Sequence, residues 1–106
     1  MSSEYSPDVA KYVKNPDEKA IKGIVKHLGI ALRGKDASLV SCSSKDELAR
    51  VRDSWLKKKL ALTDDDKVLY AAIKEVCEQM KGATRKHRVT FYYLLAEKYG
   101  KLGEIA

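Results

Sequence analysis

The chain has 106 residues, of which 44% are hydrophobic and 34% are charged, and its formal net charge is +6. This length fits one domain with its own core, and the composition excludes a disordered chain. No apolar run approaches the ~20 residues that cross a bilayer, and the first residues lack the basic start and apolar middle of a signal peptide. We therefore predict one cytoplasmic domain over residues 1–106, with residues 1–5 flexible.

Two helix-start signals follow each other near the beginning of the chain. Residues 6–8, Ser-Pro-Asp, combine an N-cap candidate, a proline at the first helical position and an early acid, which predicts a short helix. Asn15-Pro-Asp-Glu18 repeats the signal, with Glu18 placed to complete a capping box onto Asn15. The second helix is predicted to run to about Leu28 and to stop at Gly29.

The connection over residues 30–44 has weak periodicity. Gly34 and the run Ser41-Cys-Ser-Ser44 are typical of loops, while Leu39 and Val40 are predicted to anchor the segment against the core. A connection this long in a small domain is either partly helical or functional. We regard it as one of two candidate locations for a site.

A third helix is predicted from the capping box Ser44-Lys-Asp-Glu47 to about Leu60. At ~100° per residue its apolar side chains share an arc with Arg52 and Lys59. We interpret the two long side chains as extending past the core edge toward solvent. The alternative is that this arc faces a groove.

The fourth helix opens with the acids of residues 64–66 and is predicted to end at Gly82, and the fifth is capped by Thr84 and ends at Gly100. Residues 88–99 are apolar on nearly every side, which is typical of a core helix. No segment alternates apolar and polar residues as a strand would. The predicted fold is all-α: a compact bundle of about five helices with the C-terminal helix central.

A weak internal similarity is compatible with a duplicated helical hairpin. Ala20-Ile-Lys22 recurs as Ala72-Ile-Lys74. The connections between the paired helices differ greatly, however, and short apolar matches arise easily between helices of one period.

Residues that could carry chemistry are scattered. Cys42 and Cys77 are isolated from each other, so we predict two reduced thiols. His27, His87 and the cysteines lack the short ligand spacing of zinc sites. There is no phosphate-binding glycine loop and no supported nucleophile-base pair. We predict no metal, no cofactor and no enzymatic activity.

Four runs carry a resemblance to a known family: Val25–Leu32, Lys35–Ser43, Trp55–Leu60 and Arg88–Glu97. They resemble a family of small bacterial proteins known only under a label, domain of unknown function family 2853. The resemblance covers nearly the whole chain. It implies a stand-alone, all-helical bacterial protein, and it brings no activity, cofactor or functional residue with it.

The basic residues give the second candidate site. Residues 45–60 hold six basic and three acidic residues, and residues 83–106 hold five basic and two acidic ones. We predict an anion-attracting edge at the start of the fifth helix, to which a lysine run contributes; its members are Lys57, Lys58, Lys59, Arg85, Lys86 and Arg88. The bland alternative is ordinary solvated charge.

The sequence favours a non-catalytic interaction module with an unknown protein partner. The second hypothesis is a weak, sequence-independent nucleic-acid or anion binder that uses the basic edge, whose binding would weaken with salt. No helix-turn-helix, zinc finger or aromatic stacking platform supports base recognition. The partner, the pathway and the oligomeric state do not follow from the sequence.

Overall fold

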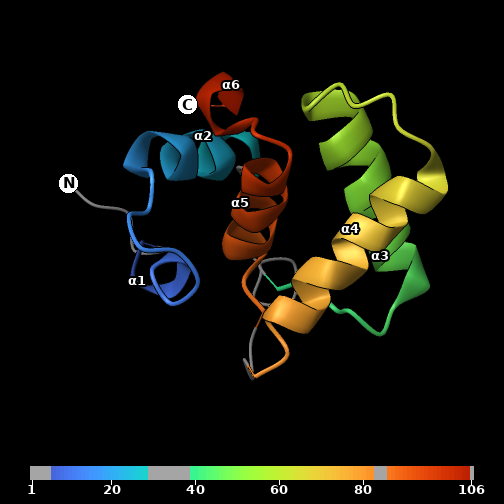
Figure 1. Cartoon of the computed structure of the whole chain (residues 1–106), viewed down its shortest axis with the longest axis horizontal. Helices are drawn as coiled ribbons and strands as arrows, with labels where there is room; N and C mark the ends of the chain where they lie inside the picture. Colours follow the sequence, from blue (N-terminus) through green and yellow to red (C-terminus); the bar gives the residue numbers. More distant parts are fainter. Residues whose placement is uncertain (1–5, 29–38, 83–85, 106) are drawn as a thin grey trace.

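The chain folds into helices that surround one central helix (Figure 1). The computed structural model describes residues 6–28, 39–82 and 86–105. The elements in order are α1 (Ser6–Val9), α2 (Glu18–Leu28), α3 (Lys45–Val51), η2 (Arg52–Lys59), α4 (Asp66–Gln79), α5 (Arg88–Lys98) and α6 (Leu102–Ile105). The predicted all-α bundle is confirmed. Within these ranges, no helix is both long and apolar enough to cross a membrane.

Helix α5 is the centre of the bundle. Every residue from Arg88 to Ala96 is buried, and α5 packs against α1, α2, η2, α4 and α6. Figure 1 shows α1 and α2 on one side of it and α3 and α4 on the other. The Trp55 ring stacks on Tyr92 with ring centroids 4.6 Å apart, and its Nε1 donates a hydrogen bond to the Tyr92 carbonyl. The predicted central position is therefore confirmed.

The chain continues beyond α5 into a short helix that the sequence did not predict. Gly100 has a φ of +67° and ends α5, because an L side chain rarely adopts this backbone conformation. Helix α6 follows directly and packs on α2, with Leu102 against the core. The predicted stop of the fifth helix at Gly100 is confirmed, and the additional helix α6 was not predicted.

The predicted helix starts have mixed outcomes. Ser44 is the N-cap of α3, and its hydroxyl accepts a hydrogen bond from the Glu47 N–H. The prediction of Asn15 as the cap of α2 is wrong, because the Asp17 carboxylate accepts from the N–H groups of Lys19 and Ala20 at 3.0 and 3.2 Å. The predicted cap Thr84, the stop at Gly29 and the predicted flexible residues 1–5 lie outside the described residues.

A hydrogen bond from the core helix fixes the start of α2. The Asp17 N–H donates to the Tyr93 hydroxyl at 2.8 Å, across 76 positions of sequence. Burial is the largest cause that raises the pKa of this Tyr93 hydroxyl. We expect Tyr93→Phe to lower the free energy of unfolding by about 1 kcal/mol, since one hydrogen bond is lost and the ring stays in place. Urea denaturation measures this change, and a loss near zero would mean that the Asp17–Tyr93 contact does not hold α2 to α5.

The third helix widens along its length. It is α-helical to Val51 and then π-helical, with the Leu60 N–H donating to the Trp55 carbonyl. A π-helix turns less per residue than an α-helix. The side-chain arc that was derived from the sequence at ~100° per residue therefore does not continue beyond Val51. Lys59 is exposed, while Arg52 is half-buried and pairs with Asp53 at 2.9 Å. The predicted extension past the core edge therefore describes Arg52 better than Lys59.

Candidate functional site

A disulfide joins the connection before α3 to helix α4. Cys42 and Cys77 are bonded, with their Cα atoms 6.0 Å apart and 35 positions between them in sequence. The prediction of two reduced thiols is therefore wrong in this structure. It rested on sequence separation, which says nothing of distance once helices pack, and the Cα separation lies within the usual range for a disulfide.

The fold brings Cys42 to α4 through the start of α5. Leu39 forms an isolated antiparallel bridge with His87, and the Val40 N–H donates to the Lys86 carbonyl at 2.8 Å. Val40 is buried in the core, as the sequence predicted for this anchor. The segment 39–43 is thus held by backbone pairing on one side and by the disulfide on the other.

Arg88 strengthens this arrangement from inside the protein. Its guanidinium donates to the Leu39 carbonyl at 3.2 Å and pairs with the Glu47 carboxylate. The two side chains are only 9% and 15% exposed, so the ion pair is largely shielded from water. A charge-assisted hydrogen bond is stronger than a neutral one. Arg88 therefore ties segment 39–43 and α3 to α5, and its charge is directed inward.

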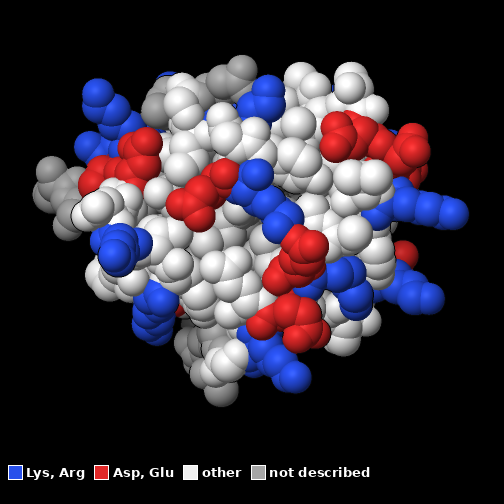
Figure 2. Space-filling view, in the orientation of Figure 1, with Lys and Arg blue, Asp and Glu red and all other residues white. Residues whose placement is uncertain are grey.

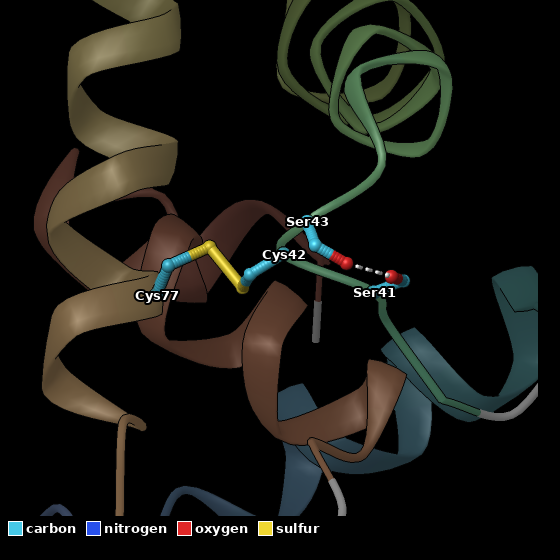
Figure 3. The surroundings of a disulfide bond; sticks show 4 residues. All are labelled: Ser41, Cys42, Ser43 and Cys77. Atoms are coloured by element: carbon cyan, nitrogen blue, oxygen red, sulfur yellow. Dashed lines mark hydrogen bonds between the residues drawn. A yellow bond between two sulfur atoms is a disulfide. The ribbon is translucent and has the colours of Figure 1, made fainter.

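An open pocket of about 770 Å³ surrounds the disulfide. One wall is segment 39–43 and the other is the last part of α4 (Figure 3). We call this the disulfide pocket, and its lining is Leu39, Val40, Ser41, Cys42, Ser43, Lys74, Cys77, Glu78, Lys81 and Lys86. Figure 3 shows the Cys42 side chain directed toward α4 and the hydroxyls of Ser41 and Ser43 directed toward each other. The serine hydroxyl oxygens lie 3.1 Å apart.

The disulfide pocket is electropositive. Among the described residues, Lys74, Lys81 and Lys86 line it, and Glu78 contributes one carboxylate. The end of α4 contributes the opposite sign, since a helix C-terminus carries about half a negative charge. Three full positive charges outweigh one carboxylate and this partial charge. The pocket therefore favours an anion that approaches from solvent.

The predicted basic edge is divided between the two ends of α4. Lys57 pairs with Asp66 at the first residue of that helix, and this hydrogen bond is the largest cause that lowers the pKa of the Asp66 carboxyl. Lys86 lies in the disulfide pocket beside Lys81, beyond the other end. A helix of 14 residues is ~20 Å long, so these two lysines do not share one surface.

The other predicted members of the edge also lie apart. Lys58 is exposed. Lys59 lies near His27 of α2. The pKa of the His27 imidazole is lowered mainly by burial and, to a smaller extent, by the charge of Lys59. Arg85 lies outside the described residues. Figure 2 shows basic and acidic side chains interspersed on the face in view, rather than one broad basic patch.

The pocket residues limit what chemistry this surface offers. Within residues 6–28, 39–82 and 86–105, no three His, Cys, Asp or Glu side chains form a group that could hold a metal ion. The polar groups of the described pocket residues are ammonium ions, hydroxyls and one carboxylate, beside a disulfide. They are suited to ion pairing, hydrogen bonding and thiol–disulfide exchange.

Sequence reasoning found only part of this site. It identified the connection 30–44 as a candidate location and Lys86 as a candidate residue, but it missed the cysteine pair, Lys74 and Lys81. One signal was present: Lys74 precedes Cys77 by three positions and Lys81 follows it by four, a spacing that gathers side chains on one helix face.

Comparison with known families adds one finding. A family model described as "Protein of unknown function (DUF2853)" matches residues 4–103. No curated protein matches the chain.

Proposed function

The chain belongs to this family of proteins of unknown function, and we propose that it is a non-catalytic binding module whose disulfide pocket receives the carboxylates of an acidic protein segment. One observation carries the proposal: of the described residues that line the pocket, three are lysines, from α4, the turn after it and the approach to α5, and one is a glutamate. The cytoplasmic location and bacterial origin remain predictions.

The shape of the pocket supports an extended segment as the occupant. Its volume of about 770 Å³ lies within the range of ligand sites, and it is open between two walls rather than enclosed. The apolar side chains of Leu39 and Val40 line it beside the charged groups. Such a surface offers several lysines to successive acidic side chains, while apolar atoms of the segment lie against Leu39.

The charges support weak binding. An exposed ion pair contributes about 0.2–1 kcal/mol, so three lysines supply at most about 3 kcal/mol, which corresponds to binding in the millimolar range or weaker. This affinity suits a reversible contact that gains strength only when the partner offers further surface.

Nucleic acid is the competing ligand. The contacts of the basic edge favour nucleic acid less than the disulfide pocket favours an acidic segment. Lys57 is paired with Asp66, and Arg88 is directed into the protein. Among the described residues, Lys86 is the one that the edge and the disulfide pocket share. We therefore favour the acidic segment, and nucleic-acid binding becomes an outcome of the test.

We expect a fluorescent octaglutamate peptide to bind the oxidised protein at low ionic strength, as measured by anisotropy, and a matched glutamine peptide not to bind. The triple variant Lys74→Glu, Lys81→Glu, Lys86→Glu should weaken binding roughly tenfold or more, because three attractions become repulsions. The matched control reverses Lys19, Lys22 and Lys26, which are exposed on α2. It has the same net charge and should bind like the parent.

Equal loss of binding in both triple variants would contradict the proposal, because the effect would then come from net charge. The same series with a short duplex and a single strand tests the alternative. If nucleic acid binds and the peptide does not, the protein is a nucleic-acid binder and the acidic-segment proposal is overturned.

A further inference from the structure

We infer that the Cys42–Cys77 disulfide is a thiol–disulfide exchange site for a small thiol that carries carboxylates. This inference concerns the covalent bond in the pocket wall, so it goes beyond peptide binding and holds whether or not an acidic segment binds. Two independent observations carry it: the accessibility of the cysteines and the position of the lysines around Cys77.

The first observation is that both cysteines lie at an open surface of the protein. Both cysteines are only partly buried, and both line the open pocket. Cys42 lies between two exposed serines, whose small side chains lie on the opposite side of the segment from its sulfur (Figure 3). Exchange requires a thiolate to approach a disulfide sulfur, and no bulky neighbour in segment 41–43 covers that of Cys42.

The second observation concerns the sulfur that leaves. Lys74 lies on α4 three positions before Cys77, and Lys81 lies in the turn just after α4; both line the pocket together with Cys77. Positive charge favours a thiolate over a thiol. The end of α4, with about half a negative charge, and the carboxylate of Glu78 act against this, and the two full positive charges still exceed their sum. Cys77 is therefore the better leaving group, and Cys42 is the sulfur that is attacked.

The reaction balances with two small thiols. The thiolate of the first attacks Sγ of Cys42, a new S–S bond forms, the Cys42–Cys77 bond breaks, and its electron pair leaves on Cys77 as a thiolate. A second small thiolate then attacks the mixed disulfide at the sulfur of the first and releases Cys42. Two small thiols are oxidised to one disulfide, and the protein disulfide is reduced to two thiols.

The same lysines select the small thiol. Lys74, Lys81 and Lys86 line the path to the bond, so they raise the local concentration of an anionic thiol and lower that of a cationic one. A carboxylate-bearing thiol is therefore the preferred reductant. The corresponding small disulfide reverses the reaction.

The test compares two probes on the native oxidised protein: reduced glutathione, which carries carboxylates, and cysteamine, which carries an amine. Rates are followed by alkylation and intact mass, and are corrected for the thiolate fraction of each probe. We expect glutathione to react roughly tenfold faster at low salt. Samples quenched with acid should carry the glutathione adduct on Cys42.

The variant Lys74→Glu, Lys81→Glu should remove or reverse the preference, while Lys22→Glu, Lys26→Glu should keep it. Circular dichroism verifies that both variants fold. The inference is overturned if the bond resists glutathione until denaturant is added, if the two probes react equally, or if the adduct forms on Cys77. No peptide is present, so failure here is separate from failure of the acidic-segment proposal.

Discussion

Replacing Phe91 with Ala is expected to lower the free energy of unfolding by about 3–5 kcal/mol. Phe91 is fully buried on α5, the helix around which the others pack. The substitution removes the buried ring and leaves a cavity that rigid neighbours fill only in part. Equilibrium urea denaturation, followed by circular dichroism, measures the change. Leu94→Ala on the same helix should cost on the order of 3 kcal/mol.

Val68→Ala is the matched control for these truncations. Val68 is an apolar helical residue with 49% of its surface exposed, so its truncation should change stability by no more than about 0.5 kcal/mol. If the Phe91 and Leu94 variants unfold at the same urea concentration as the Val68 variant, α5 is not the centre of the core.

Removing the disulfide is expected to cost about 3–4 kcal/mol. The bond closes a loop of 35 positions, and the chain-entropy relation assigns a loop of that length this amount of stabilisation, because the cross-link restricts the unfolded chain. The double variant Cys42→Ser, Cys77→Ser should therefore unfold at a lower urea concentration than the oxidised parent. Paired backbone contacts of Val40 with Lys86 remain, so the native fold should persist.

Reduced parent protein is the control for the serine variant. Its stability should match that of the double variant, because both lack the cross-link. Oxidised and reduced parent proteins of equal stability would mean that the bond does not constrain the unfolded chain. A reduced protein without native circular dichroism would mean that segment 39–43 depends on the disulfide for its position.

The parts of the fold that were predictable depend on local patterns. Ser44 caps α3 because its hydroxyl reaches an N–H three residues away, which the sequence spacing states directly. The central role of α5 follows from a run that is apolar on all sides, since no surface helix tolerates such a run. Fold class and the main core helix were therefore open to prediction.

The parts that were not predictable depend on contacts across the fold. Asp17 rather than Asn15 caps α2 while its own N–H is held by Tyr93 from α5. The Cys42–Cys77 pair arises because residues 39 and 87 pair next to the end of α4. Arg88 belonged to the predicted basic edge, and the ion pair with Glu47 directs it inward. The spacing of these residues along the sequence does not predict any of these contacts.

The most direct test of the disulfide pocket as the binding site is an amide NMR titration of the oxidised, ¹⁵N-labelled protein with the octaglutamate peptide. Chemical-shift changes should concentrate on Ser41, Ser43, Cys77, Lys81 and Lys86, which line the pocket, and should be absent from the pocket triple variant. Changes that instead concentrate on Lys57, Lys58 and Lys59, or that spread evenly over the surface, would contradict the assignment of the site to the disulfide pocket.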